Sequence, residues 1–442
     1  TLAEKTAFGM VKKYLEERGE SAGNAELDRL TLGCVGVRRT TGQHPGGLVV
    51  VPDDMDVEDF TAVQHPADDP DSDTVTTHFE YHCMEDNLLK LDMLGHDDPT
   101  MIRMLEDLTG VNARAIPLDD PDTMSIFTSS KVLGFENDEI LGPTGAVAIP
   151  EFNTRFTRGM LMDTMPKDFN TLVRLSGFSH GTDVWLGNAR DLIVGGTASV
   201  LETVGCRDDI MLYLISMGLD PKMSFKIMEA VRKGKVKKGG FQEGWEEAMR
   251  EHQVPDWYIG SLAKIGYLFP KAHAVAYVMM AFRIAWFKVH EPLAFYATFF
   301  SIRAKAFDAE YCCAGMDAVK QKIREIENNK DATDVEQNLL VTLEVCYEFY
   351  LRGFHFDTIS IYDSDATHFK VTENGLLPPF VTVRGLGETA ALDTVEKRQG
   401  KTFVSVEEFA TTCNKLSKTH IEQLKALGAF AGMADTSQVA LF

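Results

Sequence analysis

A strand-like run, Leu88-Leu89-Lys90-Leu91-Asp92-Met93-Leu94, places one lysine and one aspartate among apolar residues. In a β-strand the side chains alternate between two faces, so Lys90 and Asp92 share one face while Leu91 and Met93 share the other. Opposite charges on a mostly buried strand are costly unless they serve each other or a site. The alternation therefore predicts a mostly buried strand whose two charged side chains either pair with each other or serve a site.

Asp92 has two interpretations. It can hold a metal ion for phosphoryl transfer, a reaction that needs several carboxylates around two ions about 4 Å apart. The acidic stretch 53–73 could offer others, although its composition is that of a solvated loop, and the first interpretation expects the missing carboxylates outside this chain. Asp92 can equally be an ordinary aspartate before the turn at residues 96–99.

A glycine-rich stretch, Gly42-Gln43-His44-Pro45-Gly46-Gly47, precedes the first predicted strand. Four of its six residues favour turns or a close approach of the backbone. Because Arg38 and Arg39 come just before it, this loop could present backbone N–H groups to a phosphate. The alternative is an ordinary hairpin that ends in Pro-Gly-Gly.

Length and composition predict a soluble globular protein of two to four domains, since 442 residues are 44% hydrophobic and 25% charged. The longest apolar segment, residues 272–289, is interrupted by His273, Arg283 and Lys288 and predicts a buried helix. Seven scattered cysteines without a C-x-x-C pair argue against a zinc site and a disulfide framework. They predict a reducing, cytoplasmic setting.

Charge is segregated along the chain. The net charge of −22 argues against a generic nucleic-acid binder. Residues 53–73 hold nine acidic side chains, whereas residues 222–238 hold seven basic side chains and one glutamate. The basic segment, with Lys233, Lys235 and Lys237 at its centre, predicts a local surface for nucleic acid.

The order of predicted elements gives an α+β, mostly α-helical fold. Residues 1–33 are predicted to be helical, residues 34–105 to carry β-strands, and residues 106–310 to be mostly helical. Residues 311–431 combine helices with a small strand-containing piece, and residues 432–442 form a tail. A helix already under way at residues 1–17, without an initiator methionine, leads us to expect a segment of a larger protein.

The stretch Ser176-Gly177-Phe178-Ser179-His180-Gly181-Thr182 is predicted to be a loop between helices. A serine and a histidine together could indicate a hydrolase, but neither a G-x-S-x-G context nor a partnering acid is evident. A loop that contacts a nucleotide and a plain connecting loop are the two other interpretations.

A long helix is predicted to begin at Phe269-Pro270-Lys271-Ala272-His273-Ala274. Cations in a first turn oppose the helix dipole. A bound anion would make this arrangement favourable, because backbone N–H groups, Lys271 and His273 would all surround it. The alternative is a surface helix that tolerates its lysine.

Two further motifs lie near the end of the chain. Arg384-Gly385-Leu386-Gly387 precedes a helix and could offer backbone amides to DNA phosphates, or it could be an ordinary turn. Gln438-Val439-Ala440-Leu441-Phe442 could dock in an apolar pocket of a partner, or it could be a frayed terminus.

Six stretches of the chain, which include several of those above, together resemble the PolC-type alpha subunits of bacterial DNA polymerase III, in the C-terminal third of such chains. They are residues 39–47, 90–100, 149–152, 176–188, 206–211 and 269–277. The resemblance implies a template-dependent polymerase that adds deoxynucleotides to a primer by two-metal phosphoryl transfer. It implies two Mg²⁺ ions, primed template DNA, deoxynucleoside triphosphates and a sliding clamp.

The same resemblance implies domains: the end of the thumb at 1–33, the C-terminal part of the palm at 34–105, and helical fingers at 106–310. A duplex-binding region at 311–431 would contain a helix-hairpin-helix element at about 383–430, and a clamp-binding tail would occupy 432–442. The palm pair Asp-x-Asp and the exonuclease and PHP domains of that family are absent here. In isolation the chain could therefore be a DNA- and clamp-binding module without turnover.

The resemblance also implies a role for particular residues. Asp92 would be a catalytic carboxylate and metal ligand, and Lys90 would neutralise phosphate beside it. The incoming nucleotide would be received by Arg174, Ser176, Gly177, Ser179, His180, Lys271 and His273. DNA would be contacted by His44, Gly46, Gly47, Lys233, Lys235, Lys237, Arg384, Gly385 and Gly387. The clamp would be contacted by Gln438, Leu441 and Phe442.

Overall fold

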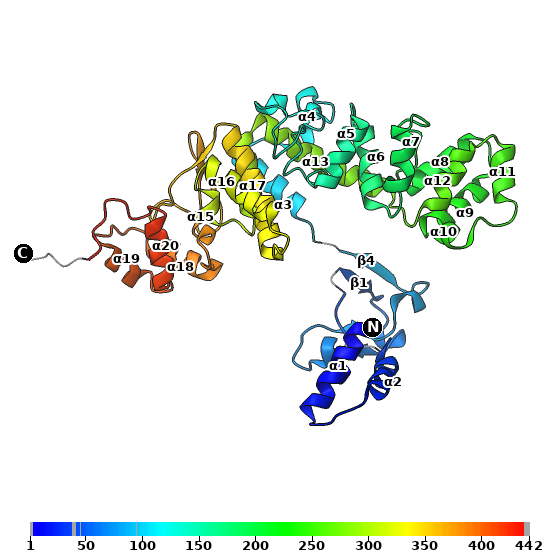
Figure 1. Cartoon of the computed structure of the whole chain (residues 1–442), viewed down its shortest axis with the longest axis horizontal. Coiled ribbons are helices and arrows are strands. Elements are labelled where there is room, and N and C mark those ends of the chain that lie inside the picture. The colour runs from blue at the N-terminus through cyan, green and yellow to red at the C-terminus, as the bar shows by residue number, and fades with distance from the viewer. Residues whose placement is uncertain (1–2, 38–40, 45, 94, 437–442) are drawn as a thin grey trace, which may run out of the picture. The chain divides into compact units, whose positions relative to one another are not determined.

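The computed structural model describes residues 3–37, 41–44, 46–93 and 95–436, apart from the side chain of His82. The chain divides into two compact units, Thr1–His96 and Asp97–Phe442, and Figure 1 labels many of their helices and strands. The mostly helical α+β fold predicted from the sequence is confirmed.

The first unit combines two helices with two small antiparallel sheets. Helix α1 (Glu4–Glu17) packs on α2 (Asn24–Cys34) through its buried residues Ala7, Val11 and Leu15. Strand β1 (Gly47–Val50) pairs with β4 (Leu89–Asp92), and β2 (Val63–Gln64) pairs with β3 (Thr76–Thr77). Three short 3-10 turns lie at Val57–Asp59, Pro66–Asp68 and Tyr81–Cys83. The acidic stretch therefore contains only short regular elements.

The second unit begins with a series of helices. Local capping chemistry explains several starts: the Asp120 side chain caps α4, and Pro255 directly precedes α12. The helices are α3 (Asp97–Thr109), α4 (Pro121–Ser125), α5 (Arg155–Thr164), α6 (Phe169–His180), α7 (Arg190–Val194), α8 (Arg207–Ser216), α9 (Pro221–Arg232), α10 (Lys235–Gly239), α11 (Trp245–Glu251), α12 (Asp256–Lys264), α13 (Lys271–His290) and α14 (Pro292–Ile302).

The main core of this unit surrounds α13 and α14, whose apolar residues are largely buried. Among the described residues, α13 alone is long and apolar enough to cross a membrane. Its residues Ala274, Val278 and Phe282 are buried against neighbouring helices, as in the core helix of a globular protein. The buried helix predicted for this segment is confirmed.

The remainder of the second unit adds six helices and one three-stranded sheet. Strands β5 (His355–Phe356), β7 (Gly375–Leu377) and β6 (Lys370–Val371) lie side by side in that order. The helices are α15 (Ala309–Cys312), α16 (Met316–Asn328), α17 (Asp334–Leu351), α18 (Glu388–Lys397), α19 (Val406–Thr412) and α20 (Lys418–Ala426). The last three helices share a smaller core with Phe380, Phe409 and Phe430.

Candidate functional site

Strands β1 and β4 bring the glycine-rich stretch next to Asp92. Gly47 lies directly opposite Asp92, and the Met93 N–H donates to the Gly46 carbonyl at 2.6 Å. Because the register also pairs Val49 with Lys90, both charged side chains project from one face of this sheet. Two motifs more than 40 residues apart thus form one small polar surface.

Lys90 and Asp92 form an ion pair on this face. The Lys90 ammonium lies 3.2 Å from Asp92 Oδ1 and also 4.9 Å from the centre of the Tyr81 ring. The Lys90 side chain is 29% exposed, whereas that of Asp92 is 63% exposed. The carboxylate is therefore accessible to a ligand from solvent.

The mostly buried strand predicted around Asp92 is wrong for this chain. Leu89 is 63% exposed and its cross-strand partner Val50 is 40% exposed. Leu48 and Leu91, which also face each other, are 55% and 41% exposed. A two-stranded sheet has too few neighbours to cover an apolar face. The alternation in the sequence therefore predicts which side chains share the apolar face, but not whether other residues bury that face.

The glycine-rich loop does not present the N–H groups that the sequence suggested. The Gly46 and Gly47 N–H groups donate to His44 Nδ1, at 3.2 and 2.7 Å. A Cβ atom on Gly47 would lie 3.0 Å from that nitrogen, so glycine fits this close approach. A phosphate would have to displace the His44 ring to reach these amides.

Residues 176–180 are not a loop. They form the last turns of α6, which continues to His180, and Ser176 and Gly177 are buried there. The Ser179 hydroxyl donates to the Ser176 carbonyl at 3.0 Å, so that bond runs back along the helix. Serine and glycine favour turns locally, but close packing of this segment keeps it helical.

His180 has an acidic partner that the sequence did not reveal. Its Nε2 forms a short hydrogen bond with Glu151 Oε2, and the Ser176 hydroxyl donates to the same oxygen at 3.4 Å. This hydrogen bond is the main cause that raises the pKa of His180 above its usual value of 6.5, against the opposing effect of burial. His180 is thereby kept as a cation nearer to neutral pH.

Arg174 is committed to contacts within the chain. Its guanidinium pairs with Asp209 and donates to the carbonyls of Thr203 and Leu201 at 2.8 and 3.0 Å. The side chain is only 12% exposed. It therefore fixes α6 against the segment that precedes α8.

The start of α13 does meet an anion, and this anion belongs to the chain itself. The Lys271 N–H donates to Asp208 Oδ2 at 2.6 Å, and the Lys271 ammonium lies 3.5 Å from Asp209 Oδ1. These aspartates lie at the start of α8, so the sequence around Lys271 gave no sign of them. Two residues further along α13, His273 stacks on Tyr277 with ring centres 4.2 Å apart.

Gly177 has a packing role. A Cβ atom there would lie 2.5 Å from the carbonyl oxygen of Gly205 and 2.8 Å from the sulfur of Cys206. We expect Gly177→Ala to lower the free energy of unfolding by about 1–3 kcal/mol, because overpacking forces backbone shifts. Urea unfolding followed by tryptophan fluorescence measures this change.

Gly159 provides the matched control. It also lies inside a helix, α5, but a Cβ atom there would meet nothing within 4 Å. Gly159→Ala should be neutral or stabilising by up to about 1 kcal/mol. Equal effects of the two substitutions would show that helix propensity, and not the contact with Gly205, decides the stability at Gly177.

The predicted basic surface is exposed but partly paired. Lys233 lies 3.2 Å from Glu229, and Lys237 lies 2.6 Å from Asp183. Lys235, at the start of α10, is exposed to solvent. All three ammonium groups remain on the surface, where exposed ion pairs are weak and exchange readily.

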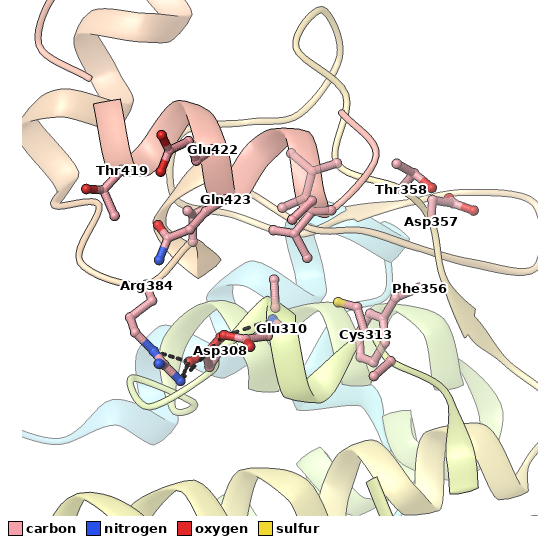
Figure 2. A pocket seen from close by; sticks show the side chains of 16 residues that line it. Asp308, Glu310, Cys313, Phe356, Asp357, Thr358, Arg384, Thr419, Glu422 and Gln423 are labelled. Carbon is pink, nitrogen blue, oxygen red and sulfur yellow. Dashed lines mark hydrogen bonds and ion pairs between the residues drawn. The ribbon is translucent and has the colours of Figure 1, made fainter. Parts of the chain in front are cut away.

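Arg384 lines a cavity (Figure 2), and its side chain is also 53% exposed to solvent. Its guanidinium lies 2.8 Å from Asp308. Hydrogen bonding to Tyr311 and then to Asp308 raises the pKa of Arg384. The cavity has a volume of about 590 Å³. Its other acidic side chains are Glu310, Asp357 and Glu422. A phosphate would meet net negative charge inside it.

The glycines of this turn do have the geometry expected of a hairpin between helices. Gly385 has a left-handed backbone, with φ of 77°, and Gly387 is the N-cap of α18. A left-handed φ favours glycine. The three clamp-binding candidates, Gln438, Leu441 and Phe442, lie outside the described residues.

The donor set for a metal ion is incomplete among the residues that the structure describes. No group of three or more histidine, cysteine or acidic side chains there could hold a metal ion. Asp92 offers one exposed carboxylate, a hard oxygen donor of the type that Mg²⁺ prefers. The chain thus fits a shared site to which it contributes one ligand.

Three parts of the chain match models of known protein families. Residues 98–253 match the model of the bacterial DNA polymerase III alpha subunit finger domain, and residues 3–95 match that of the bacterial DNA polymerase III alpha NTPase domain. Residues 353–439 match a helix-hairpin-helix motif. Since the two alpha-subunit ranges together span more than half of its residues, the chain belongs to the bacterial DNA polymerase III alpha subunits.

Within that family the chain is of the PolC type. It is 55% identical to DNA polymerase III PolC-type of Caldanaerobacter subterraneus, 52% to that of Halalkalibacterium halodurans and 51% to that of Streptococcus pyogenes. Each alignment covers 100% of this chain. The chain spans 30–31% of the length of these curated relatives.

Proposed function

We propose that this chain supplies part of a replicative polymerase that adds deoxynucleotides to a primer as directed by a template. The observation that carries the proposal is the pairing of Gly47 with Asp92, which sets a glycine-rich loop beside an accessible carboxylate and a lysine. Similarity to PolC-type polymerases over the whole chain supports it. The domain ranges given above for thumb, palm, fingers and duplex-binding region are part of this proposal.

Asp92 is the residue that would hold Mg²⁺, together with carboxylates of the rest of the polymerase. When bound, the metal supplies charge neutralisation and a more acidic primer hydroxyl. Lys90, 3.2 Å from Asp92, orients the carboxylate and adds positive charge near the reacting phosphate. The catalytic contribution of this chain is positioning and electrostatics, without a covalent nucleophile.

The exposed apolar face of β1 and β4 is the surface that the rest of the palm would cover. Leu48 and Leu89 are each more than half exposed. Contiguous exposed apolar side chains of this kind often mark a surface that another segment or protein covers. The relatives are about three times longer than this chain, so covering segments are available in them. If such segments cover this face in the whole polymerase, the apolar sequence of β4 is accounted for.

The second unit would receive the nucleotide and the DNA. We assign the nucleotide phosphates to the exposed part of His180 and to the side chains of Lys271 and His273. The Lys271 backbone N–H is taken by Asp208, but the Lys271 side chain is 36% exposed. Arg174, Ser176, Gly177 and Ser179 would act by shaping this region. The side chains of Arg174, Ser176 and Ser179 bond to groups of the chain itself, and Gly177 permits close packing. Duplex DNA would contact Lys233, Lys235, Lys237 and the amides near Gly385 and Gly387, and in the first unit His44, Gly46 and Gly47.

The remaining parts of the proposal concern the cellular setting. A cytoplasmic location agrees with seven cysteines that form no disulfide. The segment with Gln438, Leu441 and Phe442 would dock on a sliding clamp. The second candidate function is a DNA- and clamp-binding module without turnover, and the single carboxylate at Asp92 favours it for the chain in isolation.

The test is a primer-extension assay of the 442-residue chain, with Mg²⁺, four deoxynucleotides and a primed template, beside a titration of DNA binding. We expect binding without extension, because one carboxylate cannot hold two metal ions. Template-dependent extension would contradict this division of the active site. Failure to bind the primed template at low salt would contradict the DNA-binding role.

Salt dependence identifies the binding surface in the same titration. Reversal of Lys233, Lys235 and Lys237 to glutamate should make the slope of log K against log salt shallower, by roughly 0.9 for each DNA phosphate that these lysines no longer neutralise. The same reversal at Lys5, Lys12 and Lys13 on α1 makes an equal change in net charge. Equal slopes for the two triple variants would exclude a specific role of the segment with α10.

A further inference from the structure

The buried side chain of Lys288 holds the loop that leads to Glu151. Residues 144–150 are buried, and the Lys288 ammonium donates to the carbonyls of Gly145 and Val147 at 2.8 and 2.6 Å. Ala148 and Glu151 have left-handed backbones, with φ of 64° and 68°. Non-glycine residues keep such conformations only where their surroundings fix them, often beside functional groups.

This loop positions the Glu151 carboxylate beside the end of α6. Glu151 Oε2 meets the His180 Nε2 atom and accepts from the Ser176 hydroxyl. The Glu151 side chain is 10% exposed, whereas the His180 ring is 33% exposed. The carboxylate is therefore sheltered, and the imidazole between it and solvent can offer its other edge to a ligand.

The surroundings of His180 favour its charged form. His180 is the last residue of α6, where the helix dipole stabilises a cation. The groups that face it are Glu151 from the loop and, at the start of α13, Phe269 and His273, with ring centres 5.4 and 5.7 Å from that of His180. A positive charge on His273 would oppose that on His180, so Glu151 is the facing group that favours the imidazolium.

We propose that Glu151 is a positioning residue for nucleotide binding, which holds the His180 imidazolium toward the triphosphate of an incoming deoxynucleotide. This inference rests on the proposed function of the second unit. Phosphate oxygens accept charge-assisted hydrogen bonds, which are roughly twice as strong as neutral ones. The fixed loop makes that interaction available without reorganisation when the nucleotide arrives.

The first test measures the imidazole directly. In histidine-labelled chain, with the His180 resonance assigned from His180→Gln, NMR titration gives its pKa. We expect the pKa of His180 to lie above 6.5 and to fall in Glu151→Gln, which keeps the size of the side chain but removes its charge. An unchanged pKa in Glu151→Gln would overturn the proposal.

The second test measures affinity for dATP by the shift of nucleotide resonances. Because His180 has a raised pKa, its contribution to binding is full at low pH and is lost as pH rises through that pKa. Glu151→Gln should therefore weaken binding about three- to tenfold at about pH 7.5 and much less at about pH 5.5. A loss equal at both pH values would mean that Glu151 only supports the fold, and would overturn the positioning role.

Two further outcomes separate this inference from the proposed function. Glu139→Gln removes an exposed carboxylate that pairs with Lys320 and Arg324, and it should leave the pKa of His180 and the dATP affinity unchanged. If the wild-type chain binds no dATP at any pH, the nucleotide site itself is refuted. If it binds dATP and Glu151→Gln binds equally at every pH, only the role of Glu151 is refuted.

Discussion

Replacing Lys288 by methionine should lower the free energy of unfolding of the second unit by about 3–5 kcal/mol. Lys288 and Glu348 are both fully buried, with the ammonium 2.7 Å from Glu348 Oε1. Methionine fills most of the space but leaves the carboxylate of Glu348 without its cation, and an uncompensated buried charge costs this much. Burial lowers the pKa of Lys288 to about 8, which shows how strongly this environment disfavours a lone charge.

The network around this pair explains why the effect should extend over the whole unit. The Tyr296 hydroxyl donates to Glu348 at 2.7 Å, and Arg352 donates to the Lys288 carbonyl at 2.9 Å. Lys288 also holds the loop at Gly145. One side chain thus connects α13, α14 and α17 with the segment that leads to Glu151.

Urea unfolding followed by tryptophan fluorescence measures the change, since all four tryptophans lie in the second unit. Lys288→Met with Glu348→Leu should recover most of the lost stability, because apolar replacement of both partners is often neutral. Lys233→Met, at an exposed pair with Glu229, should change stability by less than about 1 kcal/mol. If Lys288→Met changes it no more than Lys233→Met, the network is not a main support of the fold.

Local sequence patterns predict several helices and one strand of this fold. The apolar segment 272–289 predicts α13, and residues 1–17 predict α1, because helices depend on adjacent residues. Strand alternation likewise predicts β4 and puts Lys90 and Asp92 on one face, as the structure has them. These features depend on neighbours in the sequence, so one sequence is enough to find them.

The partners of the site residues could not be predicted in this way. Glu151 lies 29 residues from His180, and Asp208 lies 63 residues from Lys271. Such pairs arise from tertiary packing, which periodicity does not encode. The helical state of Ser176 and Gly177 was missed for the same reason, since contact with Gly205 overrides their preference for turns. A left-handed residue such as Glu151 leaves no mark in the sequence at all.

Asp92→Asn, made in a PolC-type polymerase that contains this chain, should reduce nucleotide incorporation by on the order of 10³-fold or more. A metal ligand supplies several kcal/mol of charge stabilisation in the transition state, and each 1.4 kcal/mol is about tenfold in rate. Asparagine keeps the shape of the side chain but not its charge. Since Asp92 is 63% exposed and lies at the end of a short strand, the fold should tolerate the change.

Single-turnover extension of a primed template, at saturating DNA, separates this effect from binding. Affinity for the template should change less than about threefold, because the surfaces proposed for DNA phosphates are retained. Asp86→Asn removes an exposed carboxylate six residues earlier in the same unit and should leave the rate within a factor of about two. Unchanged incorporation by Asp92→Asn would remove Asp92 from the catalytic centre, and a loss shared with Asp86→Asn would indicate a general effect of charge. A loss confined to Asp92→Asn, with normal template affinity, would locate the requirement at this one carboxylate, which strand β4 holds opposite Gly47.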